Sequence, residues 1–136
     1  MLQKLTTKRG GFTLVEIMIV VAIIALLASI AVPNFLRSRK RSQATQVLED
    51  LRLIDAAVDQ YAIENNKKSP DKVQWTDVQK YLKTGTRLET SGGKDILDGV
   101  FVQPFEVDKI PKVPAETFAA LSDVAPTTFW GPHALP

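Results

Sequence analysis

The sequence predicts an α+β chain in which a long N-terminal helix packs on a small head with a short antiparallel sheet. The run from Ile17 to Val32 is apolar apart from Ser29. After Pro33, apolar residues recur every three or four positions, which is typical of an amphipathic helix. The rest is punctuated by glycine and proline, as small loop-rich folds are. These changes of pattern divide the chain into four segments, 1–11, 12–33, 34–66 and 67–136.

The second segment is long enough to cross a membrane. As a helix, Phe12 to Val32 would span about 32 Å at ~1.5 Å per residue, which matches the apolar core of a bilayer. Glu16 lies near its start. Because an ionised carboxylate there costs at least ~2.5 kcal/mol, it marks a functional site that needs a partner.

Residues 10–16 read Gly-Gly-Phe-Thr-Leu-Val-Glu, and the pattern from Lys8 to about Ser42 resembles the type IV pilins and the type II secretion pseudopilins. The resemblance implies a pilin-like fold and a leader, residues 1–11, that a prepilin peptidase removes by cutting between Gly11 and Phe12. It also implies that the same enzyme N-methylates the new amino terminus at Phe12. Glu16 would then neutralise the Phe12 amine of a neighbouring subunit during filament assembly.

The resemblance also implies partners and a location. The partners are further copies of the chain in a helical filament, the peptidase and N-methyltransferase, the inner-membrane pilus or secretion assembly machinery, and membrane lipid before assembly. The precursor would be a single-pass inner-membrane protein with an exported head, and the product a cell-surface or periplasmic filament. Physics favours the Glu16 and Phe12 pairing, because two opposite charges in apolar surroundings are tolerable when each compensates the other.

Two alternatives stand beside a type IV pilus subunit. One is a type II secretion pseudopilin. The other is a secreted soluble binding domain whose ordinary signal peptide is cut after Ala31, since Ser29-Ile30-Ala31 satisfies the small-residue rule. The acidic Glu16 and the 16-residue length of the run from Ile17 to Val32 argue against that signal peptide.

Basic residues flank the apolar run on both sides. Removing Lys4, Lys8 and Arg9 with the leader leaves 14 basic and 15 acidic residues, a balance of −1 that predicts no nucleic-acid partner. The 104 residues after Val32 would be exported largely regardless of charge. The basic cluster that follows the run predicts a solvated collar at the lipid headgroups, or else a filament contact or partner site: Arg37, Arg39, Lys40 and Arg41.

The third segment continues the helix with one apolar stripe. Its members are Ala44, Val47, Leu48, Leu51, Ile54, Val58, Tyr61 and Ala62. Stop signals begin at Asn65, so we expect one helix from Phe12 to about Asn65. Pro33 lies between its halves and should break or bend it, because proline lacks an N–H and crowds the carbonyl of Ser29.

In the head, Thr76-x-x-Gln79 is a capping-box pattern and predicts a short helix from Thr76 to Leu82. Residues 100–107 predict a strand, with weaker candidates at Leu88 and at 110–113, in a sheet of two or three strands.

Pro114 suits the first turn of a helix that ends near Leu121, and the tail after it is expected to be irregular. Phe129 and Trp130 in that tail either fill the core of the head or form a binding platform. The chain has no cysteine, so no disulfide closes this tail.

The sequence predicts no enzyme, no catalytic residue, no cofactor and no metal. His133 is the single histidine and is expected to be exposed. Asp95, Asp98 and Asp108 could form a calcium-binding loop or could be aspartates that form turns. Their uneven spacing favours turns.

Overall fold

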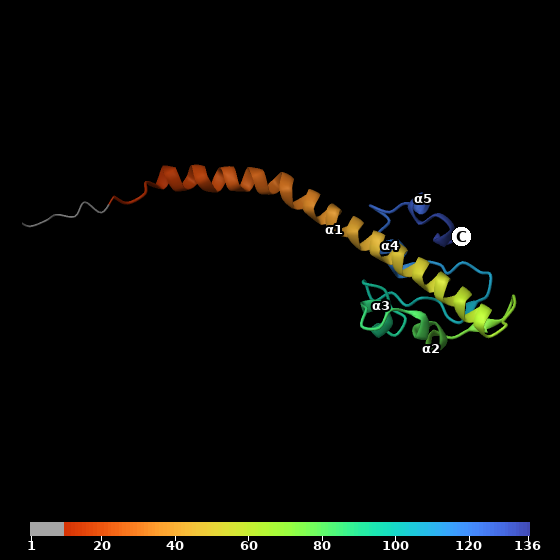
Figure 1. Cartoon of the computed structure of the whole chain (residues 1–136). Helices are drawn as coiled ribbons and strands as arrows, with labels where there is room; N and C mark the ends of the chain where they lie inside the picture. Colours follow the sequence, from red (N-terminus) through yellow and green to blue (C-terminus); the bar gives the residue numbers. More distant parts are fainter. Residues whose placement is uncertain (1–9) are drawn as a thin grey trace, which may run out of the picture. The chain divides into compact units, whose positions relative to one another are not determined.

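The computed structural model describes residues 10–136. They fall into two compact units, one that ends at Leu36 and one that runs from Arg37 to Pro136. The long helix α1 spans Leu14–Glu64 and belongs to both units (Figure 1). The predicted α+β, pilin-like class is confirmed by this helix and by a small head with a two-stranded antiparallel sheet.

The helix α1 begins and ends within two residues of the predicted bounds. Asn66 ends it in a left-handed conformation, with φ of 51°, and the Lys67 N–H donates to the Ala62 carbonyl at 2.8 Å. This is the geometry of a Schellman stop, in which asparagine replaces the usual glycine. The helix is continuous through Pro33, so the predicted break is not seen as an interruption of α1. Whether Pro33 loosens the helix stays a prediction.

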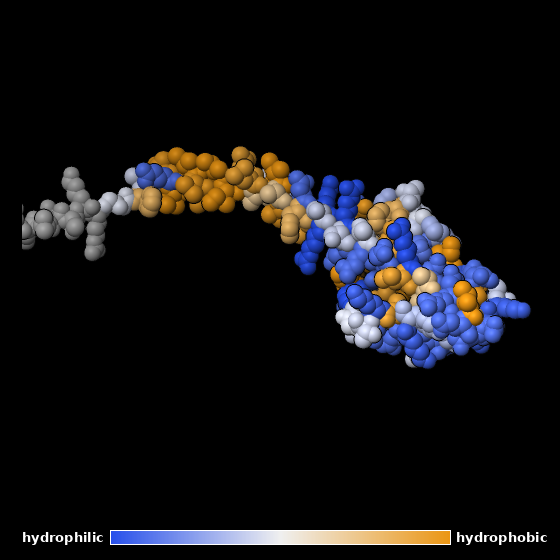
Figure 2. Space-filling model, viewed as in Figure 1, coloured by the Kyte–Doolittle hydropathy of each residue, from blue (hydrophilic) through white to orange (hydrophobic). Residues whose placement is uncertain are grey.

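The N-terminal part of α1, which we call the stem and which ends at Leu36, exposes apolar side chains along nearly its whole length, and the face seen in Figure 2 is mostly hydrophobic. Its most apolar 18-residue window has a mean hydropathy of 2.9, and none of that window is buried. By length and composition the stem can cross a membrane, and it lacks the polar face that a surface helix of a soluble protein carries.

The core of the head forms along the predicted stripe of α1. Two residues of the stripe, Leu48 and Tyr61, are only partly buried, and the other six are buried. Asp50 is also buried on this side of the helix, where it forms an ion pair with Arg87. Burial raises the pKa of Asp50, and the nearby guanidinium opposes that rise.

Four short helices and two 3-10 turns cover the stripe, and their bounds are α2 Trp75–Val78, η1 Gln79–Tyr81, α3 Arg87–Thr90, α4 Ala115–Ala120, α5 Thr127–Trp130 and η2 Gly131–His133. The predicted helix after Pro114 is confirmed as α4. The helix predicted at 76–82 is present as α2 and η1, but it begins one residue earlier, because the indole of Trp75 is buried in the core and sets the first turn. The prediction of a capping box at Thr76 is therefore wrong, since Gln74 precedes the first helical residue and no side chain caps the helix.

The sheet pairs β1, Lys72–Val73, with β2, Phe105–Glu106, in antiparallel register. The predicted strand at 100–107 is thus reduced to two residues, because Pro104 has no N–H to give to a partner strand. Of the weaker candidates, Leu88 lies in α3, and 110–113 pairs with no strand within residues 10–136.

The tail is more ordered than predicted. Trp130 is fully buried and its indole N–H donates to the Ala125 carbonyl at 3.1 Å, which confirms its place in the core. His133 is also buried, so its expected exposure is wrong. The Val113 N–H donates to the His133 carbonyl, which holds the tail against the head, and the ring Nδ1 lies 2.8 Å from the Pro111 carbonyl. Because that carbonyl only accepts, Nδ1 carries the proton.

Candidate functional site

The predicted cleavage site lies in exposed, non-helical chain just before α1. Gly11 and Phe12 precede the first helical residue, and the Phe12 side chain is 85% exposed. A Cβ added at Gly11 would meet no atom within 4 Å. The fold itself therefore does not require glycine at this position.

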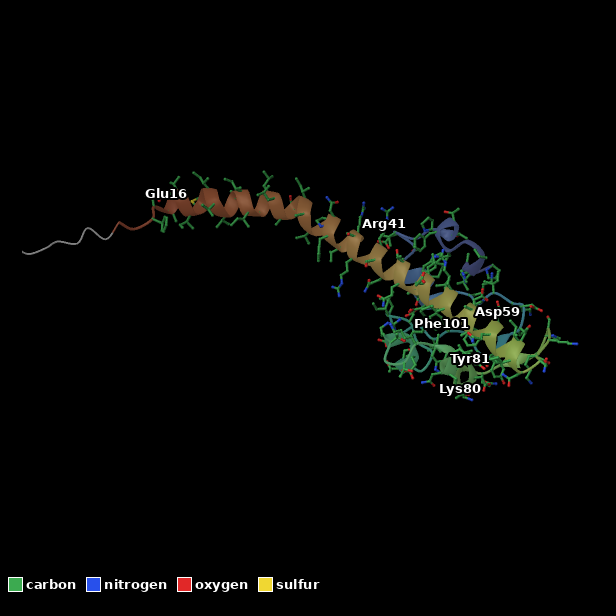
Figure 3. All side chains as sticks on the ribbon, viewed as in Figure 1. Glu16, Arg41, Asp59, Lys80, Tyr81 and Phe101 are labelled. Carbon is green, nitrogen blue, oxygen red and sulfur yellow. The ribbon has the colours of Figure 1, made fainter. Side chains whose placement is uncertain are left out.

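Glu16 sits in the first turn of α1 in a reciprocal capping arrangement with Thr13. The Thr13 N–H donates to Glu16 Oε2 at 2.9 Å, and the Glu16 N–H donates to Thr13 Oγ1 at 3.2 Å. These are the two hydrogen bonds of a capping box, which satisfy backbone donors at a helix start. Figure 3 marks Glu16 at the beginning of the helix. Sequence reasoning missed the role of Thr13, although Thr13-x-x-Glu16 fits the same pattern that was applied at Thr76.

The capping box leaves the Glu16 carboxylate able to bind a second donor. An ionised carboxylate offers about four lone-pair positions, and Thr13 occupies one of them. The positive end of the helix dipole also favours a negative charge in the first turn. The site can thus hold the Thr13 N–H and an ammonium group from another chain at the same time.

The collar residues, 37–41, differ in their partners. Lys40 Nζ contacts Asp123 Oδ2 at 3.0 Å, and this hydrogen bond is the main reason that the pKa of Asp123 lies below its ordinary value. The other three basic residues of the collar are exposed and form no ion pair within 4.0 Å in the part of the chain that the structure describes. They are Arg37, Arg39 and Arg41.

The three aspartates that could have formed a calcium loop lie in turns. Asp95 is buried, and its Oδ1 accepts the N–H groups of Leu97 at 2.8 Å and Gly99 at 2.9 Å, while its Oδ2 accepts the hydroxyl of Thr117. The other two aspartates, Asp98 and Asp108, have the left-handed φ values of 63° and 65° that tight turns use. Within residues 10–136 no group of three or more possible metal ligands gathers.

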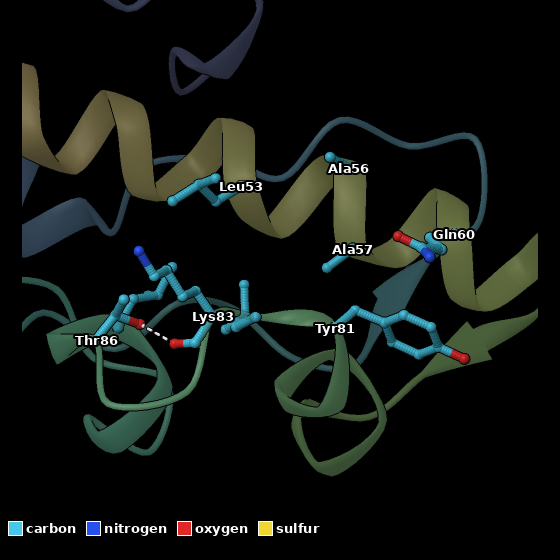
Figure 4. Close-up of a pocket in the computed structure, with 9 residues that line it drawn as sticks. Leu53, Ala56, Ala57, Gln60, Tyr81, Lys83 and Thr86 are labelled. Atoms are coloured by element: carbon cyan, nitrogen blue, oxygen red, sulfur yellow. Dashed lines mark hydrogen bonds between the residues drawn. The ribbon is translucent and has the colours of Figure 1, made fainter.

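A pocket of about 140 Å³ lies between α1 and the chain around η1 and α3 (Figure 4). Leu53, Ala56 and Ala57 of α1 line one side, and Tyr81 and Thr86 line the other. Ligand sites usually measure ~300–1,000 Å³, so this pocket is small for one.

Comparison with known proteins gives one family model and several relatives, each of which matches part of the chain. A model described as the prokaryotic N-terminal methylation motif matches residues 6–32. The type II secretion system core protein G of Klebsiella pneumoniae is 37% identical over 60 residues, 44% of this chain and 43% of that protein. The core protein G of Escherichia coli (strain K12) is 38% identical over 61 residues, 45% of this chain and 42% of that one.

A pilin matches as well. The type IV major pilin protein PilA of Myxococcus xanthus (strain DK1622) is 40% identical over 62 residues, 46% of this chain and 28% of that protein. The aligned part of this chain spans less than half the length of each of these relatives. No solved structure matches. The methylation motif and these relatives confirm the resemblance: residues 6–32 match the motif, and the chain is similar over part of its length to a type IV pilin and to type II secretion core proteins.

Proposed function

We propose that this chain is a structural subunit of a type IV pilus-like filament and has no enzymatic activity of its own. The observation that carries the proposal is the pairing of an exposed, fully apolar stem with one carboxylate, Glu16, fixed at its first turn. A stem without a polar face is stable only in lipid or packed against other apolar helices. A filament core supplies the second environment after the membrane has supplied the first.

Processing follows from the chain just before α1. Proteases cut extended, accessible backbone, and Gly11 and Phe12 are both exposed and precede the helix. Cleavage between them by a prepilin peptidase would leave an amine at Phe12, which the enzyme then methylates. The new amine would follow the apolar stem into the filament, so a counter-charge is needed.

Glu16 supplies that counter-charge. Its carboxylate is held by Thr13 and keeps free acceptor positions, so it can bind the Phe12 amine of a neighbouring copy without losing the helix cap. Before assembly the subunit would span the inner membrane, with its head exported and its collar among the lipid headgroups. Its partners would be the peptidase and the membrane assembly machinery.

A type II secretion pseudopilin is the second candidate, because core protein G is among the similar proteins. Both functions use the same processing and the same stem. The secreted soluble domain has less support, since the Ala31–Val32 bond that its signal peptidase would cut lies inside α1.

The mature N-terminus tests the proposal. We expect mass spectrometry of the protein from sheared filaments to show an N-terminal peptide that begins with methylated Phe12. The same measurement in cells without prepilin peptidase should give the uncut chain in the membrane. A mature protein that begins at Val32 would refute the proposal.

A further inference from the structure

The charged residues of the head part of α1, of which Asp50 is buried, are separated by sign along the helix. The collar, 37–41, holds four basic residues and no acidic one, whereas residues 49–64 hold five acidic residues and one basic residue. Figure 3 marks Arg41 and Asp59, one in each part of the helix. Some of these charges are paired within the head, namely Lys40 with Asp123, Glu49 with Arg52 and Asp50 with Arg87. The charges that form no ion pair are available to other molecules.

Two residues of each part repeat with the same spacing. Arg37 and Arg41 are four apart, and Asp55 and Asp59 are also four apart. Each arginine precedes its aspartate by 18 residues. Because an α-helix has 3.6 residues per turn, 18 residues make about five whole turns and about 27 Å, so all four side chains leave the same side of α1.

Within the described chain these two sets have only longer-range partners: the Arg37 charge helps to lower the pKa of Asp123, and His133 acts on Asp55. The two arginines form no ion pair within 4.0 Å among residues 10–136, and the same is true of Asp55 and Asp59. Two like charges at this spacing repel each other. Partial burial and then the Asp59 charge raise the pKa of Asp55, while His133 opposes the rise. The head thus contains an acidic pair and a basic pair that form no direct ion pair among residues 10–136.

We propose that Arg37 and Arg41 of one copy bind Asp55 and Asp59 of a second copy, whose α1 lies parallel and is displaced by about 27 Å. One displacement brings Arg37 to Asp55 and Arg41 to Asp59 at the same time, because both separations are 18 residues. The binding surfaces differ from each other, so the contact is head-to-tail and repeats from copy to copy. Such a contact builds an open filament and not a closed dimer.

The inference rests on the proposed function, because it explains what the collar does after it leaves the membrane. In the precursor the arginines would lie beside the phosphates of the lipid headgroups on the exported side of the membrane. When the subunit leaves the membrane and enters a filament, the arginines lose their contact with the lipid phosphates. The Asp55 and Asp59 carboxylates of the neighbouring copy replace these phosphates as partners of the arginines. The arginines in turn reduce the repulsion between the two carboxylates.

Cysteine cross-linking tests the contact directly, since the chain contains no cysteine. We expect filaments of the double variant Arg41→Cys, Asp59→Cys to form a ladder of disulfide-linked multimers on oxidation. A disulfide within one chain is impossible, because the two positions are about 27 Å apart and a disulfide needs Cα atoms within ~7 Å. Arg41→Cys with Lys80→Cys is the matched control, since Lys80 is exposed but lies on η1. Filaments of the test pair that stay monomeric on the gel would overturn the proposal.

Charge reversal supplies the second test. Asp59→Lys and Arg41→Glu should each lower the yield of sheared filaments at least about tenfold, because each places like charges opposite one another. The combined variant restores opposite charges and should recover to within about twofold of the original chain. Single reversals without effect, or a double variant without recovery, would overturn the contact. Absence of filaments from the unmodified chain would instead refute the proposed function.

Discussion

Replacement of Glu16 separates its charge from its role as a helix cap. Glutamine at this position still accepts the Thr13 N–H, because a capping box forms with either glutamate or glutamine. Glu16→Gln therefore removes only the charge, whereas Glu16→Val removes both the charge and the cap. Thr13→Val is the matched control, since it removes the hydroxyl of the cap and keeps the carboxylate.

The sizes of the two effects differ enough to be distinguished. Removal of one partner from a buried ion pair costs about 3–5 kcal/mol. Since each 1.4 kcal/mol is tenfold, both Glu16 variants should weaken subunit addition by roughly 10²-fold to 4 × 10³-fold. Loss of one capping hydrogen bond costs about 1 kcal/mol, so Thr13→Val should weaken subunit addition only about fivefold. Glu16→Asp keeps the charge with a shorter reach and should lie between these values.

Filament yield in sheared fractions measures assembly, and the amount of subunit in the membrane fraction measures insertion. We expect membrane levels to hold in all four variants, because none of them makes the stem more polar than glutamate does. Normal filaments from Glu16→Gln would refute the neutralising role of the charge. A loss with Thr13→Val as large as that with Glu16→Val would show that the cap, and not the charge, drives assembly.

Four further results are expected. Gly11→Val should leave an uncut precursor detectable by its mass, because the fold has room for the added Cβ whereas the proposed peptidase should accept only glycine before the cut; filaments that begin with Phe12 would contradict this. A head that begins at Arg37 should sediment as a folded monomer, since it matches a compact unit and lacks the stem; a concentration-independent multimer would show otherwise. Gly99→Ala should lower the melting temperature of that head by several degrees, because the added methyl collides with the Thr117 hydroxyl, and an unchanged value would exclude the clash. Calcium and a chelator should give the same melting temperature, and a rise of several degrees with calcium would reveal a site.

The stem could be predicted from sequence because its signals are local. An apolar run of membrane length, an asparagine-rich stop and a three- to four-residue stripe each depend on neighbours within a few turns. The α1 helix accordingly matches its predicted bounds within two residues. The Thr13 cap was equally local and could have been found, because its pattern is present in the sequence.

The head depended on contacts between distant residues. Burial of Asp50 within an apolar stripe is explained only by Arg87, which lies 37 positions away. His133 is buried because backbone hydrogen bonding to Val113 folds the tail onto the head, and no local pattern marks this pairing.

What the sequence determined by itself was the long helix, its membrane-length stem and the acidic residue at its start, since helix formation and apolar burial follow periodicity and composition. The tertiary structure alone decided which two residues of the predicted strand pair with β1 and how the tail closes the core. Strand pairing and core filling join residues that are at least about 20 positions apart in the chain, and their free energy depends on which partner each residue meets. The partner of the collar also cannot be found from local sequence, because the proposed partner belongs to another copy of the chain.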